Sequence, residues 1–260
     1  MLTSGDAVAR TGIDAAALKP AECDVRRATD LPFDTVTIDY EGREHLPDEE
    51  TLAALAEELD VRLTTPVRAD GFDPLGDDEI VRRLPASVGR VLVAGHPAYL
   101  TEGERERKVA PRLGAAVDED PDAWVGTESV ERTALATGAT QFELLSRTTA
   151  RDLRALRDAG FSGTVAVYAP TVLTDDDDAV LDAVGAYVSR RPPVARALPD
   201  DAATDGSATD RAREVLLAAS DDFALVGIAD EVHQRVSDLK SAGADLVVGY
   251  PARGIEAFLD

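Results

Sequence analysis

Cysteine and long apolar stretches are scarce in this chain of 260 residues. A single cysteine, Cys23, excludes an internal disulfide and any metal site built from several thiolates. No stretch approaches the roughly 18 apolar residues that a transmembrane helix needs, and residues 1–11 contain no apolar signal core. The sequence therefore predicts a cytoplasmic protein without a membrane partner.

Basic residues are few beside the acidic ones. Asp and Glu total 50 against 27 Lys and Arg, which gives a formal charge of -23. Such an acidic excess repels itself in dilute buffer, because the Debye length falls from roughly 10 Å at 0.1 M salt to about 3 Å at 1 M salt. The composition is typical of halophilic, archaeal proteins. Nucleic acid is not an expected partner, since no basic stripe offsets the acidic field.

Short β-branched runs alternate with amphipathic stretches along the chain. The runs expected to form strands are 16–18, 35–39, 61–67, 90–95, 123–126, 140–145, 164–169 and 245–250. Expected helices between them include 49–59, 129–137, 149–159, 175–190 and 211–220. This alternation predicts a parallel sheet, and eight units predict closure into a single (β/α)8 TIM barrel over residues 1–260. An open doubly wound sheet is the alternative.

The spacing of strands and helices breaks once, between the runs 164–169 and 245–250. This interval holds the segment LPDDAATDGSATD, residues 198–210, whose small and polar composition cannot build a core. We therefore expect 198–210 to be a flexible surface loop rather than a lid.

The stretch FALVGIADEVHQRVSDLKSAGADLVVGYPARGIEAFLD, residues 223–260, has the pattern of a buried run, an acidic helix start, a helix, a tight turn and a buried strand. It resembles the end of the luciferase-like monooxygenase family of flavin- and deazaflavin-dependent barrels. The segments LPFDTVTIDYEG, LAEELDVRLTTPV, AWVGTESVERTALATGATQFELL and TVAVYAPTVLTDDDDAVLDAVGAYVSRR resemble further parts of that family in order and spacing. The resemblance implies a barrel that binds FMN or a deazaflavin coenzyme and acts on a small molecule.

In such barrels the catalytic groups lie at the carboxyl ends of the strands. His96 follows the run 90–95, where its imidazole could move a proton near neutral pH or bond a loop carbonyl. Asp39 and Tyr40 end the second expected strand, Asp39 as a base or a helix cap and Tyr40 as a hydrogen-bond donor. Deazaflavin-dependent members of the family often carry a histidine after the acidic residue, so Tyr40 departs from their pattern.

The turn of Gly126, Thr127, Glu128 and Ser129 is the candidate phosphate site. A glycine lets backbone N–H groups approach an anion, and a helix opened by Thr127 or Ser129 offers unpaired N–H groups at its start. The resemblance places part of the cofactor phosphate site at this turn. An ordinary helix cap is the alternative, and Glu128 would repel an anion.

Three more residues complete the candidate cofactor site. Thr65 lies near the end of the third expected strand, and Arg147 and Arg253 could each pair with a phosphate through two hydrogen bonds. No metal site is expected, because the acidic run 175–178 is typical of a solvated helix start.

Three classes of function remain open. The first is a flavin- or deazaflavin-dependent oxidoreductase or monooxygenase that acts on a small-molecule substrate. The second is a barrel that has lost cofactor chemistry and acts as a binding or assembly protein. The third is a lyase or isomerase of a phosphorylated metabolite, in which Lys19 and His96 would act. The sequence leaves the oligomeric state open, with a homo-oligomer as one alternative.

Overall fold

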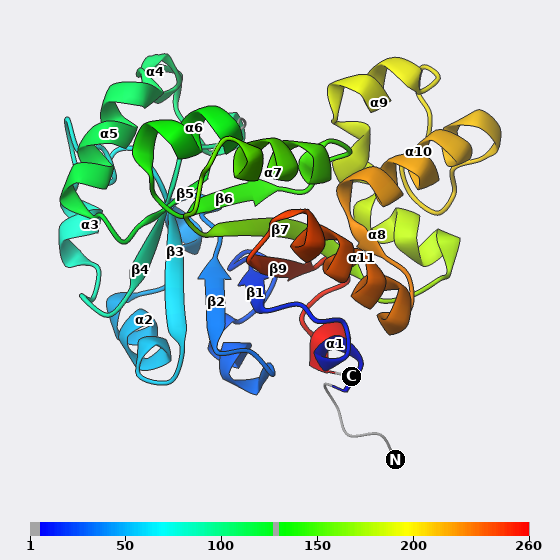
Figure 1. Ribbon diagram of the computed structural model, residues 1–260, viewed down its shortest axis with the longest axis horizontal. Helices are drawn as coiled ribbons and strands as arrows, with labels where there is room; N and C mark the ends of the chain where they lie inside the picture. Colours follow the sequence, from blue (N-terminus) through cyan, green and yellow to red (C-terminus); the bar gives the residue numbers. More distant parts are fainter. Residues whose placement is uncertain (1–5, 127–129, 260) are drawn as a thin grey trace.

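Eight parallel strands close into a barrel surrounded by helices in the computed structural model, which describes residues 6–126 and 130–259 (Figure 1). The strands of the ring are β1 (Ala15–Leu18), β2 (Thr35–Ile38), β3 (Asp60–Pro66), β4 (Gly89–Val93), β5 (Trp124–Gly126), β6 (Gln141–Leu144), β7 (Val165–Val172) and β9 (Leu246–Pro251). They pair in that order, and β9 pairs with β1 to complete the ring. The predicted TIM barrel is confirmed, and the open doubly wound sheet was the wrong alternative.

The outer layer consists of helices that connect consecutive strands. These are α2 (Glu49–Ala56), α3 (Glu79–Arg83), α5 (Val109–Glu119), α6 (Val130–Thr137), α7 (Thr149–Asp158) and α11 (Ala229–Ala242). Shorter helices are α1 (Asp6–Ala9), α4 (Glu102–Glu106), α12 (Glu256–Leu259), η1 (Val25–Asp30), η2 (Arg43–His45) and η3 (Pro97–Tyr99). Asp48 shows why a helix starts where it does, since its side chain accepts a hydrogen bond from the Thr51 N–H at 2.7 Å and caps α2.

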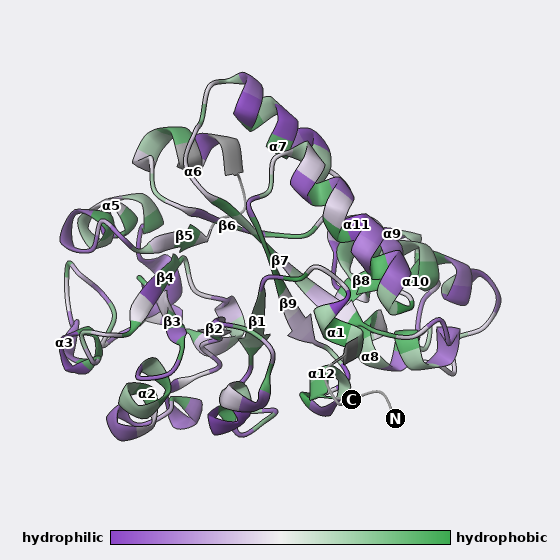
Figure 2. Cartoon of the chain, turned by 60° about the horizontal axis from the view of Figure 1, so that its bottom comes forward, coloured by the Kyte–Doolittle hydropathy of each residue, from purple (hydrophilic) through white to green (hydrophobic). Residues whose placement is uncertain are grey.

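Alternate residues of each strand face either the barrel axis or the helices, as the pleat of a strand requires. The interior contains Ala15, Ala17, Val91, Trp124, Phe142, Ala166, Tyr168 and Val248. Because β1 contributes only alanines there, the Trp124 and Phe142 rings fit inside the barrel, with centroids 5.8 Å apart. Figure 2 shows that apolar and hydrophilic residues are separated: β7 is apolar along its length, whereas the outer helices carry hydrophilic residues.

Three helices are inserted between β7 and β9. They are α8 (Asp177–Ser189), α9 (Pro192–Ala197) and α10 (Asp210–Phe223), and they stand beside the barrel with an apolar cluster of their own (Figure 1). After them, β8 (Leu225–Val226) pairs with the end of β7 outside the ring. We name α8, α9 and α10 the helical insert.

The segment 198–209 connects α9 to α10 within this helical insert. A Cβ added at Gly185 would lie 2.2 Å from the Thr204 carbonyl oxygen, so the segment approaches α8 closely. The Gly206 N–H also donates to Asp182 Oδ1 at 2.8 Å. The flexibility of residues 198–210 stays a prediction. Each helix in the described part of the chain is too short or too polar to cross a membrane.

Candidate functional site

Asp39 is the acidic residue at the end of β2. Val36 and Ile38 pack toward the helices, so the alternating pleat turns Asp39 toward the barrel axis. The Tyr168 hydroxyl, on β7, donates to Asp39 Oδ2 at 3.0 Å. Since β1 and β9 separate β2 from β7 in the ring, this hydrogen bond crosses the mouth of the barrel.

Burial governs the protonation of Asp39. It raises the pKa of the carboxyl to about 6, although the hydrogen bond from Tyr168 and the charge of Lys19 act in the opposite direction. Glu41 and Glu22 add a smaller rise through repulsion. A carboxyl with such a pKa is present in both protonation states near neutral pH. It can therefore accept or donate a proton during a reaction.

Two tyrosines and a lysine surround this carboxyl. The Tyr168 ring stacks on the Tyr250 ring of β9, with centroids 6.4 Å apart and planes at 10°. Lys19 Nζ lies 4.0 Å from the centroid of the Tyr250 ring and 3.4 Å from Glu22 Oε1. The Tyr250 hydroxyl donates to Glu22. Burial raises the pKa of both Tyr168 and Tyr250, so both hydroxyls remain protonated donors. We call Lys19, Glu22, Asp39, Tyr168 and Tyr250 the mouth cluster.

Tyr40 belongs to a different contact set from Asp39. Its ring meets the Phe72 ring edge-on at 5.3 Å between centroids and the Tyr99 ring at 6.4 Å. Its backbone N–H donates to the Thr64 hydroxyl. The structure thus places Tyr40 in an aromatic wall over β3 and β4, and its catalytic role stays a prediction.

His96 is exposed and caps η3. Its Nδ1 accepts a hydrogen bond from the Ala98 N–H at 3.1 Å, and its ring centroid lies 5.8 Å from that of Tyr99. One ring nitrogen is therefore engaged in a cap, which leaves Nε2 for any proton transfer. No contact between His96 and Asp39 is present among the described residues, and the catalytic role of His96 stays a prediction.

Gly126 ends β5 at a place where only a small residue fits. A Cβ there would lie 3.0 Å from Val93 Cγ1 and 3.4 Å from the Phe142 carbonyl oxygen. Packing alone therefore favours a glycine at position 126, whether or not a phosphate binds there. Thr127 and Ser129, the other candidates at this turn, lie outside the described residues.

The remaining candidates for cofactor binding differ in exposure. Thr65 is fully buried and its hydroxyl donates to the Val91 carbonyl at 3.4 Å, so its side chain lies within the barrel wall rather than at the surface of the mouth. Arg147 follows β6 and Arg253 follows β9, and both side chains are exposed. Neither makes a hydrogen bond or ion pair within residues 6–126 and 130–259. Their binding roles stay predictions.

Tyr168 and Tyr250 fall at the strand ends where the sequence predicts catalytic groups, but it predicted no role for them, and it did not single out Glu22. The two tyrosines stand at expected strand ends, but nothing in the sequence shows that folding brings Tyr168 of β7 within hydrogen-bond distance of Asp39 after β2. A usable signal was the alternation of side chains along a strand. Tyr168 lies two residues after Ala166, so both side chains point to the interior of the barrel. Within the described ranges, no group of His, Cys, Asp and Glu side chains is arranged to hold a metal ion.

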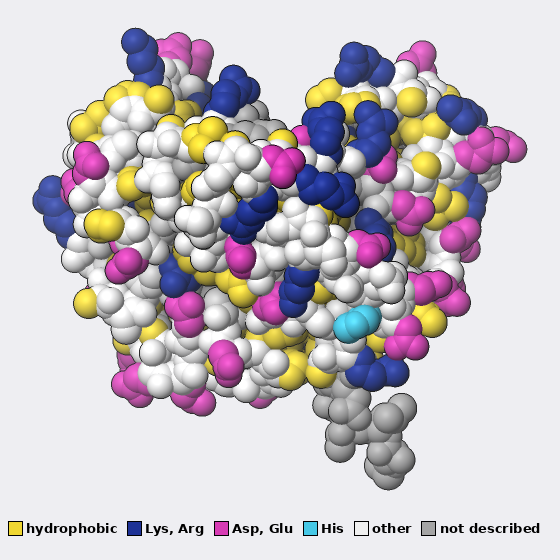
Figure 3. Space-filling view, in the orientation of Figure 1, with side chains coloured by type: hydrophobic (Ala, Val, Ile, Leu, Met, Phe, Trp, Pro, Cys, Tyr) yellow, Lys and Arg dark blue, Asp and Glu magenta, His cyan; other side chains and the backbone are white. Residues whose placement is uncertain are grey.

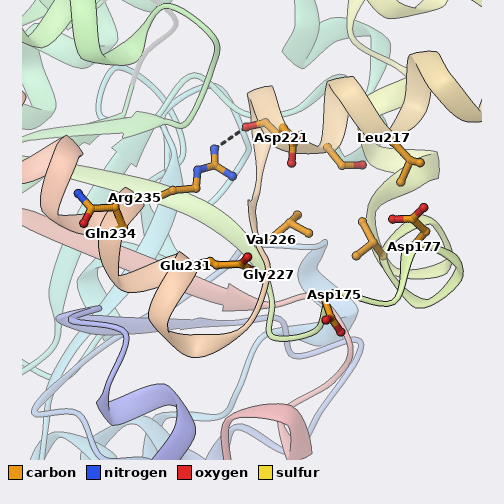
Figure 4. Close-up of a pocket in the computed structure, with 11 residues that line it drawn as sticks. Asp175, Asp177, Leu217, Asp221, Val226, Gly227, Glu231, Gln234 and Arg235 are labelled. Atoms are coloured by element: carbon orange, nitrogen blue, oxygen red, sulfur yellow. Dashed lines mark hydrogen bonds between the residues drawn. The ribbon is translucent and has the colours of Figure 1, made fainter.

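A separate cleft of about 450 Å³ lies outside the ring, between α8, α10 and α11 (Figure 4). Arg235 reaches from α11 to donate to the Asp221 carbonyl. The carboxylates that line the cleft are those of Asp175, Asp177, Asp221 and Glu231. They outnumber the single guanidinium, so this cleft does not suit an anionic cofactor.

Comparison with known proteins establishes the family and supports the fold. The chain belongs to the family described as "Family of unknown function (DUF7388)", whose model matches residues 8–258. No curated protein matches the chain. The structure is similar to an F420-dependent secondary alcohol dehydrogenase in complex with an F420-acetone adduct, with a TM-score of 0.58, 12% identity, and coverage of 95% of this chain and 99% of that chain. This similarity supports the (β/α)8 barrel as the fold.

A second solved structure, a GH138 enzyme targeting pectin rhamnogalacturonan II, matches 96% of this chain and 35% of its own length. Its TM-score of 0.37 at 10% identity is too low to indicate a shared fold.

Proposed function

We propose that this protein is a flavin- or deazaflavin-dependent oxidoreductase that acts on a small molecule at the mouth of its barrel. The observation that carries the proposal is Asp39, a carboxyl with a pKa of about 6 that Tyr168 holds at the carboxyl ends of the strands. The F420-dependent alcohol dehydrogenase with a similar fold supports the deazaflavin as the coenzyme to test first.

The residues around the mouth suit such a coenzyme. Leu144, at the end of β6, leaves 42% of its surface exposed and offers an apolar contact for a planar ring. Arg147 follows β6 and Arg253 follows β9, and both are cations that suit the coenzyme phosphate. When bound there, the coenzyme supplies the hydride chemistry, whether FMN or deazaflavin.

The chain itself would supply proton transfer and orientation. Tyr168 holds Oδ2 of Asp39, whereas Oδ1 has no hydrogen-bond partner within the described residues. Oδ1 is therefore the atom that we assign to exchange a proton with the substrate. Burial of Asp39 keeps this proton available near neutral pH, because a buried carboxyl releases it less readily.

A specific observation also favours a second candidate, a barrel that binds or assembles without cofactor chemistry. The mouth cluster satisfies much of its own bonding: Lys19 and Tyr250 both bind Glu22, and Tyr168 binds Asp39. A mouth filled by its own side chains needs no ligand to be stable.

Titration with FMN and with F420, followed by absorbance and fluorescence in molar potassium chloride, separates the two candidates. We expect saturable binding of one coenzyme per chain. Leu144→Glu should abolish binding, because it places a charge on the apolar contact, whereas Leu135→Glu on α6 should not. Leu135 is the matched control, with 60% of its surface exposed. Absence of binding at every salt concentration would leave the binding-protein candidate.

A further inference from the structure

Arg190, at the end of α8, is a cation without a partner in a strongly acidic chain. Its side chain is exposed and makes no hydrogen bond or ion pair with the residues that the structure describes. Some arginines of this chain bind carboxylates, as Arg213 of α10 does with Asp178 at 2.7 Å, whereas Arg190, like Arg147, Arg154 and Arg253, does not. Figure 3 shows basic side chains gathered beside the notch between α7 and α9, while acidic ones are spread over both lobes. An unpaired guanidinium in this setting calls for another acceptor.

The face of α8 that meets the barrel leads toward the mouth. Val180 and Val184, one turn apart, pack with Val172 at the end of β7, and Ala252, just after β9, joins the same contact. Tyr187 and Arg191 follow by further turns along the same side of α8, where Tyr187 packs with the apolar cluster of the helical insert. The carboxyl end of α8 therefore lies between the end of β7 and the other helices of the helical insert.

Electrostatic effects agree with this position. Burial raises the pKa of Tyr168, and Tyr187 adds to the rise. Burial also raises the pKa of Tyr99, on η3 after β4, and the charge of Arg190 opposes that rise. The charge of Arg190 thus reaches Tyr99, which follows β4 on the side of the barrel opposite β9. Such an effect is expected for a group above the mouth.

Arg191 holds this end of α8 in place. Its guanidinium lies over the Tyr187 ring, 4.5 Å from the centroid, and 5.3 Å from the centroid of the Phe223 ring on α10. It also donates to the Tyr187 hydroxyl, while its Nε is buried without a hydrogen-bond partner. Because two rings clamp Arg191, the adjacent Arg190 leaves the helix from a fixed position.

We propose that Arg190 binds an oxyanion, a phosphate or a carboxylate, of the ligand that lies over Asp39. Arg253 and Arg147 follow the ends of β9 and β6, whereas Glu22 and Glu41 follow the ends of β1 and β2. This division of charge orients the ligand with its anionic group toward α8, where a guanidinium can bind it through two hydrogen bonds. The position of the ligand rests on the proposed function, but binding of an oxyanion by Arg190 can be tested without it.

The first test titrates the whole chain, labelled with 15N-arginine, with inorganic phosphate at constant ionic strength. We expect the Arg190 Nε–Hε signal, assigned with Arg190→Lys, to shift saturably at about one tenth of the phosphate concentration that affects Arg154. Arg154 on α7 is the matched control, because it too is exposed and has no hydrogen bond or ion pair within the described residues. Equal responses of the two arginines would overturn the proposal.

The second test finds the source of the oxyanion by comparing FMN with riboflavin, which lacks the phosphate. If the coenzyme supplies it, Arg190→Gln weakens FMN binding about tenfold and leaves riboflavin binding unchanged. If the substrate supplies it, Arg190→Gln binds both flavins as the wild type does, while succinate reproduces the phosphate response of the Arg190 signal. Failure of both flavins to bind the wild type would count against the proposed function, whereas the phosphate titration would still decide the role of Arg190.

Discussion

The Tyr168 hydroxyl donates a 3.0 Å hydrogen bond to Asp39 Oδ2, from β7 to β2 across the mouth of the barrel. Because this bond favours the carboxylate, it offsets part of the effect of burial on the pKa of Asp39. The two residues are 129 positions apart in the sequence, so closure of the barrel sets this interaction.

Asp39 should make stability depend on pH. Its pKa rises from 3.8 to about 6 on folding, so the folded state binds the proton more tightly than the unfolded state. Stability contributed by the protonated form is present below pH 3.8 and is lost as the pH rises to about 6, by about 3 kcal/mol. Urea unfolding at several pH values should show this loss relative to Asp39→Asn, which cannot titrate. A constant difference between the two proteins from pH 3.5 to 7 would contradict the burial of Asp39.

Tyr168→Phe should raise the pKa of Asp39 further, by about one pH unit, because it removes the hydrogen bond that favours the carboxylate. The carboxyl signal of 13C-labelled aspartate, followed by NMR against pH, measures this pKa. Tyr250→Phe is the control, since the Tyr250 hydroxyl binds Glu22 instead. Equal pKa values of Asp39 in both variants would show that the bond to Tyr168 has no electrostatic effect.

Gly126→Ala should destabilise the barrel by about 1 to 3 kcal/mol, because the new Cβ would lie 3.0 Å from Val93 Cγ1. Val93→Ala in the same chain should relieve most of this contact, although that change has its own cost. A double-mutant cycle from denaturant unfolding measures the coupling of the two substitutions. Additive effects would mean that Gly126 is required for some other reason, such as approach of a phosphate.

His96→Ala should lower stability by about 1 kcal/mol through loss of the cap on η3, and His96→Asn should restore it, because asparagine also caps helices. Thermal melting compares the three proteins. If His96 also transfers a proton, turnover should fall by roughly 100-fold in both variants, since asparagine cannot replace that function. Recovery of turnover in His96→Asn would restrict the residue to the cap.

Low salt should unfold the protein cooperatively. With a formal charge of -23, repulsion between carboxylates grows as screening weakens, and we expect loss of structure below about 0.2 M salt. Circular dichroism during stepwise dialysis measures the transition. A spectrum that is unchanged down to low millimolar salt would refute the halophilic interpretation.

Alternation along the chain was enough to predict the eight strands of the ring. The run 90–95 corresponds to β4 (Gly89–Val93), and the run 164–169 corresponds to β7 (Val165–Val172), which extends farther than expected. Local patterns carry this information because each buried parallel strand is a short apolar run between helices with one apolar face. The short β8 shows the limit of such patterns, since it has a strand pairing but no place in the ring.

The sequence by itself determined the barrel, the acidic surface and the position of Asp39 at a strand end. Only the tertiary structure decided what Asp39 contacts: closure of the ring brought Tyr168 to its carboxylate, while the neighbouring Tyr40 turned to the Phe72 ring. It also brought the charge of Arg190, at the end of α8, within reach of Tyr99 on η3. The reason is physical. Strand and helix periods are local properties of a chain, whereas the desolvation and hydrogen bonding that shift the pKa of a carboxyl depend on residues that folding brings from distant positions.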